Sequence, residues 1–97
     1  MPSYITELYL ARHRYGELPS LSTQARDAAR TLIEAGQPVA YLRCAFVPED
    51  EVCLLWFIAP SRTVLSELGH LAKLEFDRVI EELERPTREE LCQPDSA

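Results

Sequence analysis

The segment from Pro38 to Ser61, PVAYLRCAFVPEDEVCLLWFIAPS, most constrains what this chain can fold into. Two apolar runs flank the polar turn Pro48-Glu49-Asp50-Glu51, and Ala59-Pro60-Ser61 ends the second run. This pattern predicts a β-hairpin followed directly by the start of a helix. Both strands are apolar on both faces, so both sides of the sheet must be covered. Two helices in a chain of 97 residues cover one side, and the other side then requires a second subunit or a ligand.

Apolar spacing predicts the remaining elements around this hairpin. The order β-α-β-β-α-β predicts an α+β, ferredoxin-like sandwich with a four-stranded antiparallel sheet. Two such sheets commonly pair, so we expect a dimeric α/β barrel. One domain is expected over residues 1–85, with a polar C-terminal tail over 86–97. The predicted elements beside the hairpin are a strand at Tyr4–Leu10, a loop at Arg12–Ser20, helices at Leu21–Gly36 and from Ser61 onward, and an edge strand at Phe76–Leu83.

Composition excludes several classes of partner. The net charge of −6 argues against nucleic acid or an anionic membrane as the main partner. No signal peptide or transmembrane span is visible, so we expect a cytoplasmic protein. Three cysteines, Cys44, Cys53 and Cys92, are an odd number without CxxC spacing. Reduced thiols are therefore favoured over a disulfide framework.

Strand alternation divides the predicted hairpin into two faces. With a four-residue turn, the face under the helices would carry only apolar side chains, including Leu42 and Cys44. The opposite face would combine apolar residues, Val39 among them, with polar-tipped side chains that suit a pocket or an interface. Glu7 and Arg43 would share that face, either as an ion pair that fixes dimer geometry or as ligand contacts. The candidate ligand-binding residues are Glu7, Tyr9, Tyr41, Arg43 and Trp56.

Catalytic and metal motifs are missing from the sequence. HExxH, CxxC, GxSxG, the P-loop and GxGxxG do not occur. The two histidines, His13 and His70, have no His or Cys partner at ligand spacing, so they are less favoured as metal ligands than as surface residues. We therefore predict no catalytic residue. Glu7 would be the candidate general base only if the chain is an enzyme.

Several segments of this sequence resemble a family of small bacterial ferredoxin-like proteins of unknown function that is commonly described as nickel-binding. The resemblance covers Tyr4 to about Leu83 and implies a ferredoxin-like fold and a homodimer. Its most specific part is the hairpin with its Ala-Pro closure. The matching segments are Tyr41-Leu42-Arg43, Val47-Pro48-Glu49-Asp50-Glu51, Val52-Cys53, Ala59-Pro60-Ser61 and Phe76-Asp77-Arg78-Val79.

The nickel function implied by this resemblance carries over poorly to this chain. Arg43 stands where nickel-binding members have a histidine on the second strand. Gly69 and Leu74 stand where they have histidines in and after the second helix, with His70 only adjacent. The chain therefore looks like a branch of the family that kept the fold and lost the metal ligands.

From sequence we expect a small cytoplasmic homodimer with an apolar pocket for a small molecule, between helices and sheet or between subunits. No cofactor is expected, although the resemblance leaves nickel possible. One alternative is an enzyme on a dimeric ferredoxin-like barrel that oxidises or isomerises a hydrophobic small molecule. A metal carrier is another, and a purely structural partner protein also fits the sequence.

Overall fold

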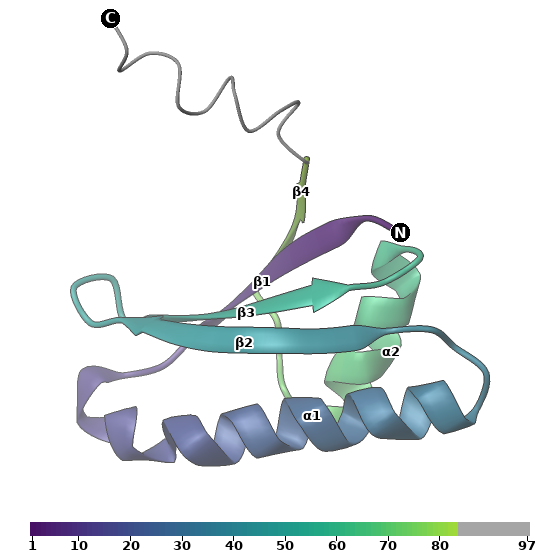
Figure 1. Ribbon diagram of the computed structural model, residues 1–97. Helices are drawn as coiled ribbons and strands as arrows, with labels where there is room; N and C mark the ends of the chain where they lie inside the picture. Colours follow the sequence, from purple (N-terminus) through teal and green to yellow (C-terminus); the bar gives the residue numbers. More distant parts are fainter. Residues whose placement is uncertain (84–97) are drawn as a thin grey trace, which may run out of the picture.

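A four-stranded antiparallel sheet with two helices builds the fold (Figure 1). The computed structural model describes residues 1–83 of the chain. Strand order is β2-β3-β1-β4, which is compatible with the predicted ferredoxin-like arrangement. The elements are β1 (Ser3–Tyr9), the 3₁₀ helix η1 (Arg12–Glu17), α1 (Leu18–Glu34), β2 (Ala40–Val47), β3 (Val52–Ile58), α2 (Arg62–Ala72) and β4 (Arg78–Glu82).

The predicted hairpin, its helix and the last edge strand are confirmed. The loop predicted at Arg12–Ser20 is wrong, because η1 leads there directly into α1, with Pro19 in the first helical turn. Proline is tolerated at this place because the first N–H groups of a helix have no helical partner. The predicted tail at 86–97 and Cys92 lie outside the described residues, as does the proposed domain boundary at 85.

The core lies between the helices and one face of the sheet. The helix-facing residues of β1 and β3 alternate with half-buried ones, which is the period-two pattern of a strand with unequal faces. Thr6 is the buried polar residue among them, and its hydroxyl donates to the Leu55 carbonyl at 3.3 Å. The largest fully buried side chains are Phe57, Leu10, Leu55, Leu65, Leu68, Thr6 and Cys53.

Both helices end in a left-handed residue with paired backbone bonds. Gly36 has φ +91°, and the Gln37 N–H donates back to the Leu32 carbonyl at 2.8 Å. Lys73 has φ +60°, and the Leu74 N–H donates to the Gly69 carbonyl at 2.9 Å. These six-to-one bonds satisfy carbonyls that have no partner within the helix. The predicted stop at Gly36 is thereby confirmed.

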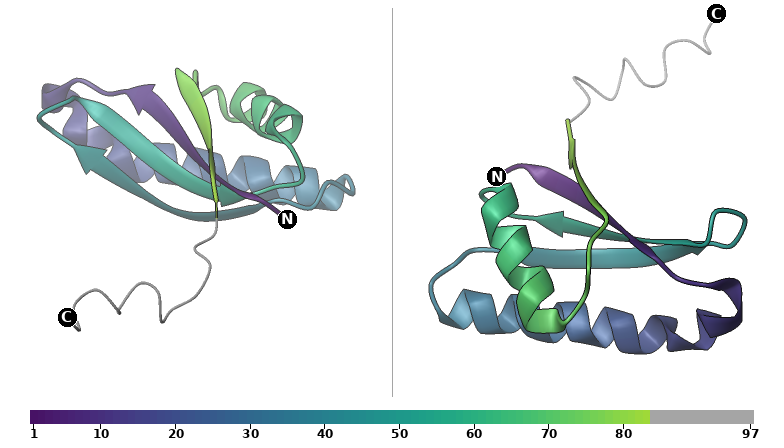
Figure 2. Two further views of the ribbon diagram at one scale, coloured as in Figure 1. Left: turned by 90° about the horizontal axis from the view of Figure 1, so that it is seen from above. Right: turned by 180° about the vertical axis from the view of Figure 1, so that it is seen from behind.

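No helix covers the other face of the sheet in the part of the chain that the structure describes (Figure 2, left). We call this surface the open face. It consists of the outward residues of all four strands, and its aliphatic members are half-buried. Nor is any helix within residues 1–83 long and apolar enough to cross a bilayer. The open face carries Ser3, Ile5, Glu7, Tyr9, Ala40, Arg43, Ala45, Val47, Val52, Leu54, Trp56, Ile58, Arg78, Ile80 and Glu82.

Candidate functional site

Arg43 and Trp56 form a stacked pair on the open face. They are direct cross-strand partners on β2 and β3, and the guanidinium carbon lies 3.7 Å from the ring centroid. A cation over an indole ring gains about 0.5–2 kcal/mol, more when water is excluded. The stack presents a flat surface with polar N–H groups at its edge, surrounded by the aliphatic residues of the open face. Both residues therefore lie on the face predicted for them.

Glu7 lies on the same face, but within one chain it does not form an ion pair with Arg43, which was one of the two alternatives for these residues. Its carboxylate instead lies 4.0 Å from a guanidinium nitrogen of Arg78, its neighbour on β4. The reason is strand order, because β3 lies between β1 and β2 and Arg43 pairs with Trp56. The Glu7 side chain is 25% exposed and that of Arg78 is 66% exposed, so this pair contributes little to stability.

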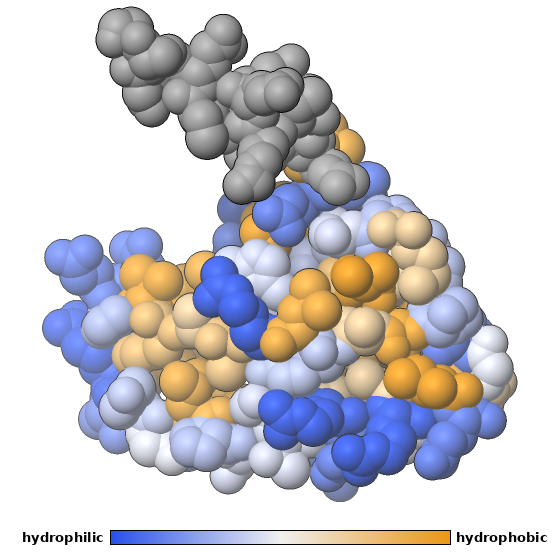
Figure 3. Space-filling model, in the orientation of Figure 1, coloured by the Kyte–Doolittle hydropathy of each residue, from blue (hydrophilic) through white to orange (hydrophobic). Residues whose placement is uncertain are grey.

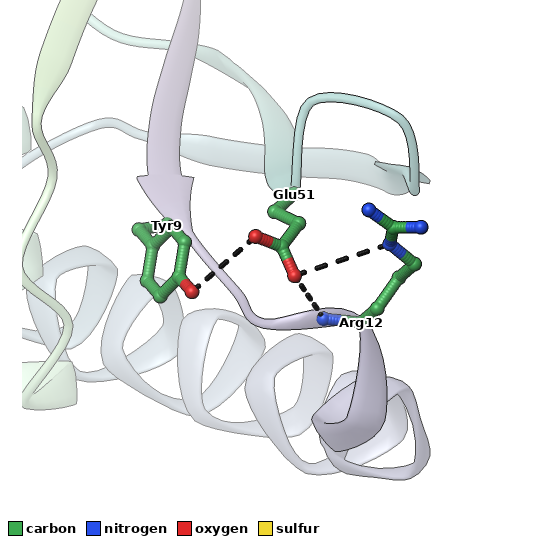
Figure 4. Close-up of polar contacts among 3 residues, drawn as sticks. All are labelled: Tyr9, Arg12 and Glu51. Carbon is green, nitrogen blue, oxygen red and sulfur yellow. Dashed lines mark hydrogen bonds and ion pairs between the residues drawn. The ribbon is translucent and has the colours of Figure 1, made fainter.

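Tyr9 lies at the end of β1, where the hairpin turn meets the chain entering η1 (Figure 4). Its hydroxyl donates to Glu51 Oε1 at 3.4 Å, while the Arg12 backbone N–H donates to Glu51 Oε2 at 2.8 Å. The Leu10 N–H also donates to the Glu51 carbonyl at 2.9 Å. Tyr9 belongs to the open face as predicted, with 58% of its surface exposed, but its polar contact serves the hairpin turn.

Tyr41 does not line the open face, so the strand face predicted for it is wrong. A register irregularity between Tyr41 and Arg43 inserts Leu42 as an extra residue, so Tyr41 pairs with Phe57. Such a bulge reverses the facing of every residue beyond it. Leu42 is therefore 50% exposed instead of packing under the helices, and Val39 is buried in the core instead of facing outward.

On the helix side, Tyr41 contacts residues that sequence reasoning missed. Its hydroxyl lies 2.7 Å from Ser22 Oγ on α1, and Arg26 of the same helix lies over its ring at 5.4 Å. Burial raises the pKa of the Tyr41 hydroxyl, with a smaller upward contribution from Cys44 beside it. Ser22 and Arg26 are four residues apart, which places them on the same face of α1. Only the bulge at Leu42 turns Tyr41 toward that face of the helix.

The cysteines of the hairpin are free, as predicted. Cys44 pairs with Leu55 and Cys53 with Phe46, which makes the two thiols diagonal neighbours. Cys53 is fully buried, and burial raises the pKa of its thiol to about 11. Cys44 is half-buried and faces a cleft at the start of α1.

The residues present do not fit the nickel site that the family resemblance implies. Arg43 offers no lone pair to a metal, and its guanidinium is stacked on Trp56. Gly69 has no side chain and Leu74 is buried. His13 and His70 are both exposed, on η1 and α2, and residues 1–83 contain no group of three or more His, Cys, Asp or Glu placed to hold a metal.

Comparisons with known proteins reach the fold but no function. No protein-family model matches the chain, and no curated protein matches its sequence. Among solved structures, the crystal structure of SCO4226 from Streptomyces coelicolor A3(2) is similar, with a TM-score of 0.64. The two sequences are 12% identical, and the match covers 88% of this chain and 96% of that one. At this identity the likeness supports a shared fold alone.

Proposed function

We propose that this chain is a homodimeric small-molecule-binding protein whose two open faces close on each other around an apolar pocket. The observation that carries the proposal is the open face itself, which is largely apolar across four strands and has no helix over it within residues 1–83. Monomeric proteins rarely leave a contiguous apolar patch of this kind uncovered. A second copy covers it with the same surface, as two-fold symmetry allows.

The pocket in this proposal is lined by the polar-tipped residues of the open face. The Arg43–Trp56 stack supplies a flat surface with a positive charge, and Glu7 supplies a carboxylate on a side chain that is 25% exposed. Aliphatic residues such as Leu54 and Ile80 lie between them. A mostly apolar enclosure with a few directed polar groups is the usual composition of a small-molecule site.

Light scattering at micromolar concentration tests the dimer, and about twice the chain mass of 11.1 kDa is expected. Arg43→Glu should shift the protein toward monomer because it removes the Arg43–Trp56 stack and adds a carboxylate to the face that already carries Glu7. Arg62→Glu is the matched control, since Arg62 also lies over an aromatic ring, that of Tyr4, but away from the open face. A monomer at all concentrations contradicts the proposal.

The neutral dye Nile red tests the pocket. Its emission should rise with the dimeric protein and fall sharply with Trp56→Ser, while Leu71→Ser on α2, which is exposed and away from the open face, serves as the control. Equal loss of the signal in both variants, or no signal with the dimer, would show that two open faces meet without enclosing a ligand site.

A further inference from the structure

A seam between α1 and the edge strand β2 carries a second candidate site, on the opposite side of the sheet from the open face. Figure 1 shows β2 running along α1, and Figure 3 shows hydrophobic surface on this side of the molecule with hydrophilic residues between and below. The α1 residues Ser22, Arg26 and Arg30 recur every four positions, so they lie on one flank of the helix. That flank faces β2 through the Ser22–Tyr41 contact.

Two clefts lie along this seam. The apolar cleft, of about 370 Å³, is lined by Tyr15, Gly16, Leu18, Pro19, Ser22 and Cys44. The Tyr15 ring stacks at 5.7 Å on Phe46 and so forms an aromatic wall. The arginine cleft, of about 300 Å³, has Arg26, Arg30 and Tyr41 among its lining residues. Ser22 and Tyr41 join the two clefts, because each lines one of them and their hydroxyls are 2.7 Å apart.

The hydroxyl pair has one hydrogen beyond the one that the two oxygens share. Either Ser22 or Tyr41 donates the hydrogen of their shared bond, and the hydroxyl that accepts keeps its own hydrogen. One oxygen atom of a ligand can therefore be bound at the junction of the two clefts. Arg26 lies one helical turn from Ser22, a rise of about 6 Å.

Charge favours an anion at the arginine cleft although the whole chain carries −6. Arg26 has no acidic partner within residues 1–83, and its guanidinium lies over the Tyr41 ring. Arg30 contacts Asp27 at 3.4 Å, but both side chains are more than 60% exposed, so the pair is weak. Within residues 1–83, no acidic side chain lines this cleft.

We propose that the α1–β2 seam binds a small aromatic carboxylate. Its ring occupies the apolar cleft against Tyr15 and Leu18, and its carboxylate reaches the Arg26 guanidinium beside the hydroxyl pair. A charge-assisted bond to arginine then supplies orientation, and the burial of the ring supplies most of the affinity. This site does not depend on the dimer proposed above, because the residues proposed to contact the ligand, Tyr15, Leu18, Ser22, Arg26 and Tyr41, do not belong to the open face.

A titration with 3-phenylpropionate, followed by amide NMR shifts up to about 10 mM, tests this site. The neutral analogue 3-phenylpropanamide is the ligand control. Shifts should concentrate at Leu18, Ser22 and Cys44, and Arg26→Gln should weaken binding of the acid about tenfold while leaving the amide unchanged. Arg62→Gln removes an arginine that also lies over a tyrosine ring, at 5.8 Å from Tyr4, and should change neither affinity.

Gly16 offers a second variant that keeps the fold. A Cβ at Gly16 would meet no atom within 4 Å, and Gly16 lines the apolar cleft, so we expect Gly16→Leu to be accommodated and to narrow this cleft. This variant should weaken the binding of 3-phenylpropionate and of 3-phenylpropanamide by the same factor. In a Cys92→Ser background, bound 3-phenylpropionate should also slow alkylation of Cys44. The proposal is overturned by an absence of binding, by shifts confined to the open face, or by equal losses with Arg26→Gln and Arg62→Gln.

Discussion

Glu7 and Arg43 share the open face of the sheet, yet each has a different partner. Glu7 lies 4.0 Å from Arg78 on β4, and Arg43 stacks at 3.7 Å on Trp56 of β3. Two strand spacings of about 4.8 Å separate β1 from β2, so the Cα atoms of Glu7 and Arg43 lie roughly 10 Å apart or more across the sheet. Two charged residues on the same face of a sheet therefore need not be in contact.

This separation predicts additive effects on stability. Glu7→Gln and Arg43→Met should each change the free energy of unfolding slightly, and the double variant should equal their sum within about 0.5 kcal/mol. Urea unfolding of the four proteins measures this coupling. A coupling of about 2 kcal/mol or more would show that the two charges do pair, within one chain or across two copies.

Glu51 should be the most sensitive residue of the hairpin turn. Its carboxylate accepts the Arg12 N–H and the Tyr9 hydroxyl, so Glu51→Ala should lower the free energy of unfolding by about 1–2 kcal/mol. Glu51→Gln keeps one carbonyl acceptor and should lower the free energy of unfolding by less than Glu51→Ala does. Glu51 also has φ +52°, so Glu51→Gly relieves backbone strain and should be milder than Glu51→Ala. Chemical denaturation of the three variants gives the order, and an alanine variant as stable as the parent would contradict it.

Gly69 should not tolerate alanine although it lies in a helix. A Cβ there would lie 3.0 Å from the Leu74 carbonyl oxygen and 3.1 Å from the Phe76 ring, because the chain turns back over this residue. Overpacking costs about 1–3 kcal/mol, which outweighs the roughly 1 kcal/mol that alanine gains in a helix. Thermal unfolding of Gly69→Ala should show a lower Tm. Gly16→Ala is the control and should be nearly neutral, because its Cβ meets open space.

Cys53 should make stability fall between about pH 9 and pH 11. Burial, with a smaller contribution from Cys44, raises the pKa of its thiol from 9.0 to about 11. In this window the unfolded thiol ionises while the folded one keeps its proton, so unfolding releases a proton and becomes easier as pH rises. The full effect is on the order of 3 kcal/mol. Cys53→Ala should flatten this part of the pH–stability curve, while Cys44→Ala should preserve it. An unchanged slope in Cys53→Ala would contradict the prediction.

Strand alternation in the sequence determined most of the fold. The hairpin, the helix that follows it and the burial of alternate residues on β1 and β3 follow from apolar spacing, which depends only on local geometry. The placement of Glu7, Arg43 and Trp56 on one face follows from the same spacing. The stop of α1 at Gly36 was also local, because a left-handed residue favours glycine.

Only the tertiary structure decided which of these residues meet. The extra residue at Leu42 sends Tyr41 to Ser22 on the helix side, and no composition or periodicity marks that bulge. Because of the strand order, Glu7 lies beside Arg78 and not beside Arg43. Neighbours across a sheet are set by the topology of the strands and not by distance along the chain. The α1–β2 seam likewise exists only because a helix and an edge strand pack together, which places Arg26 beside Tyr41.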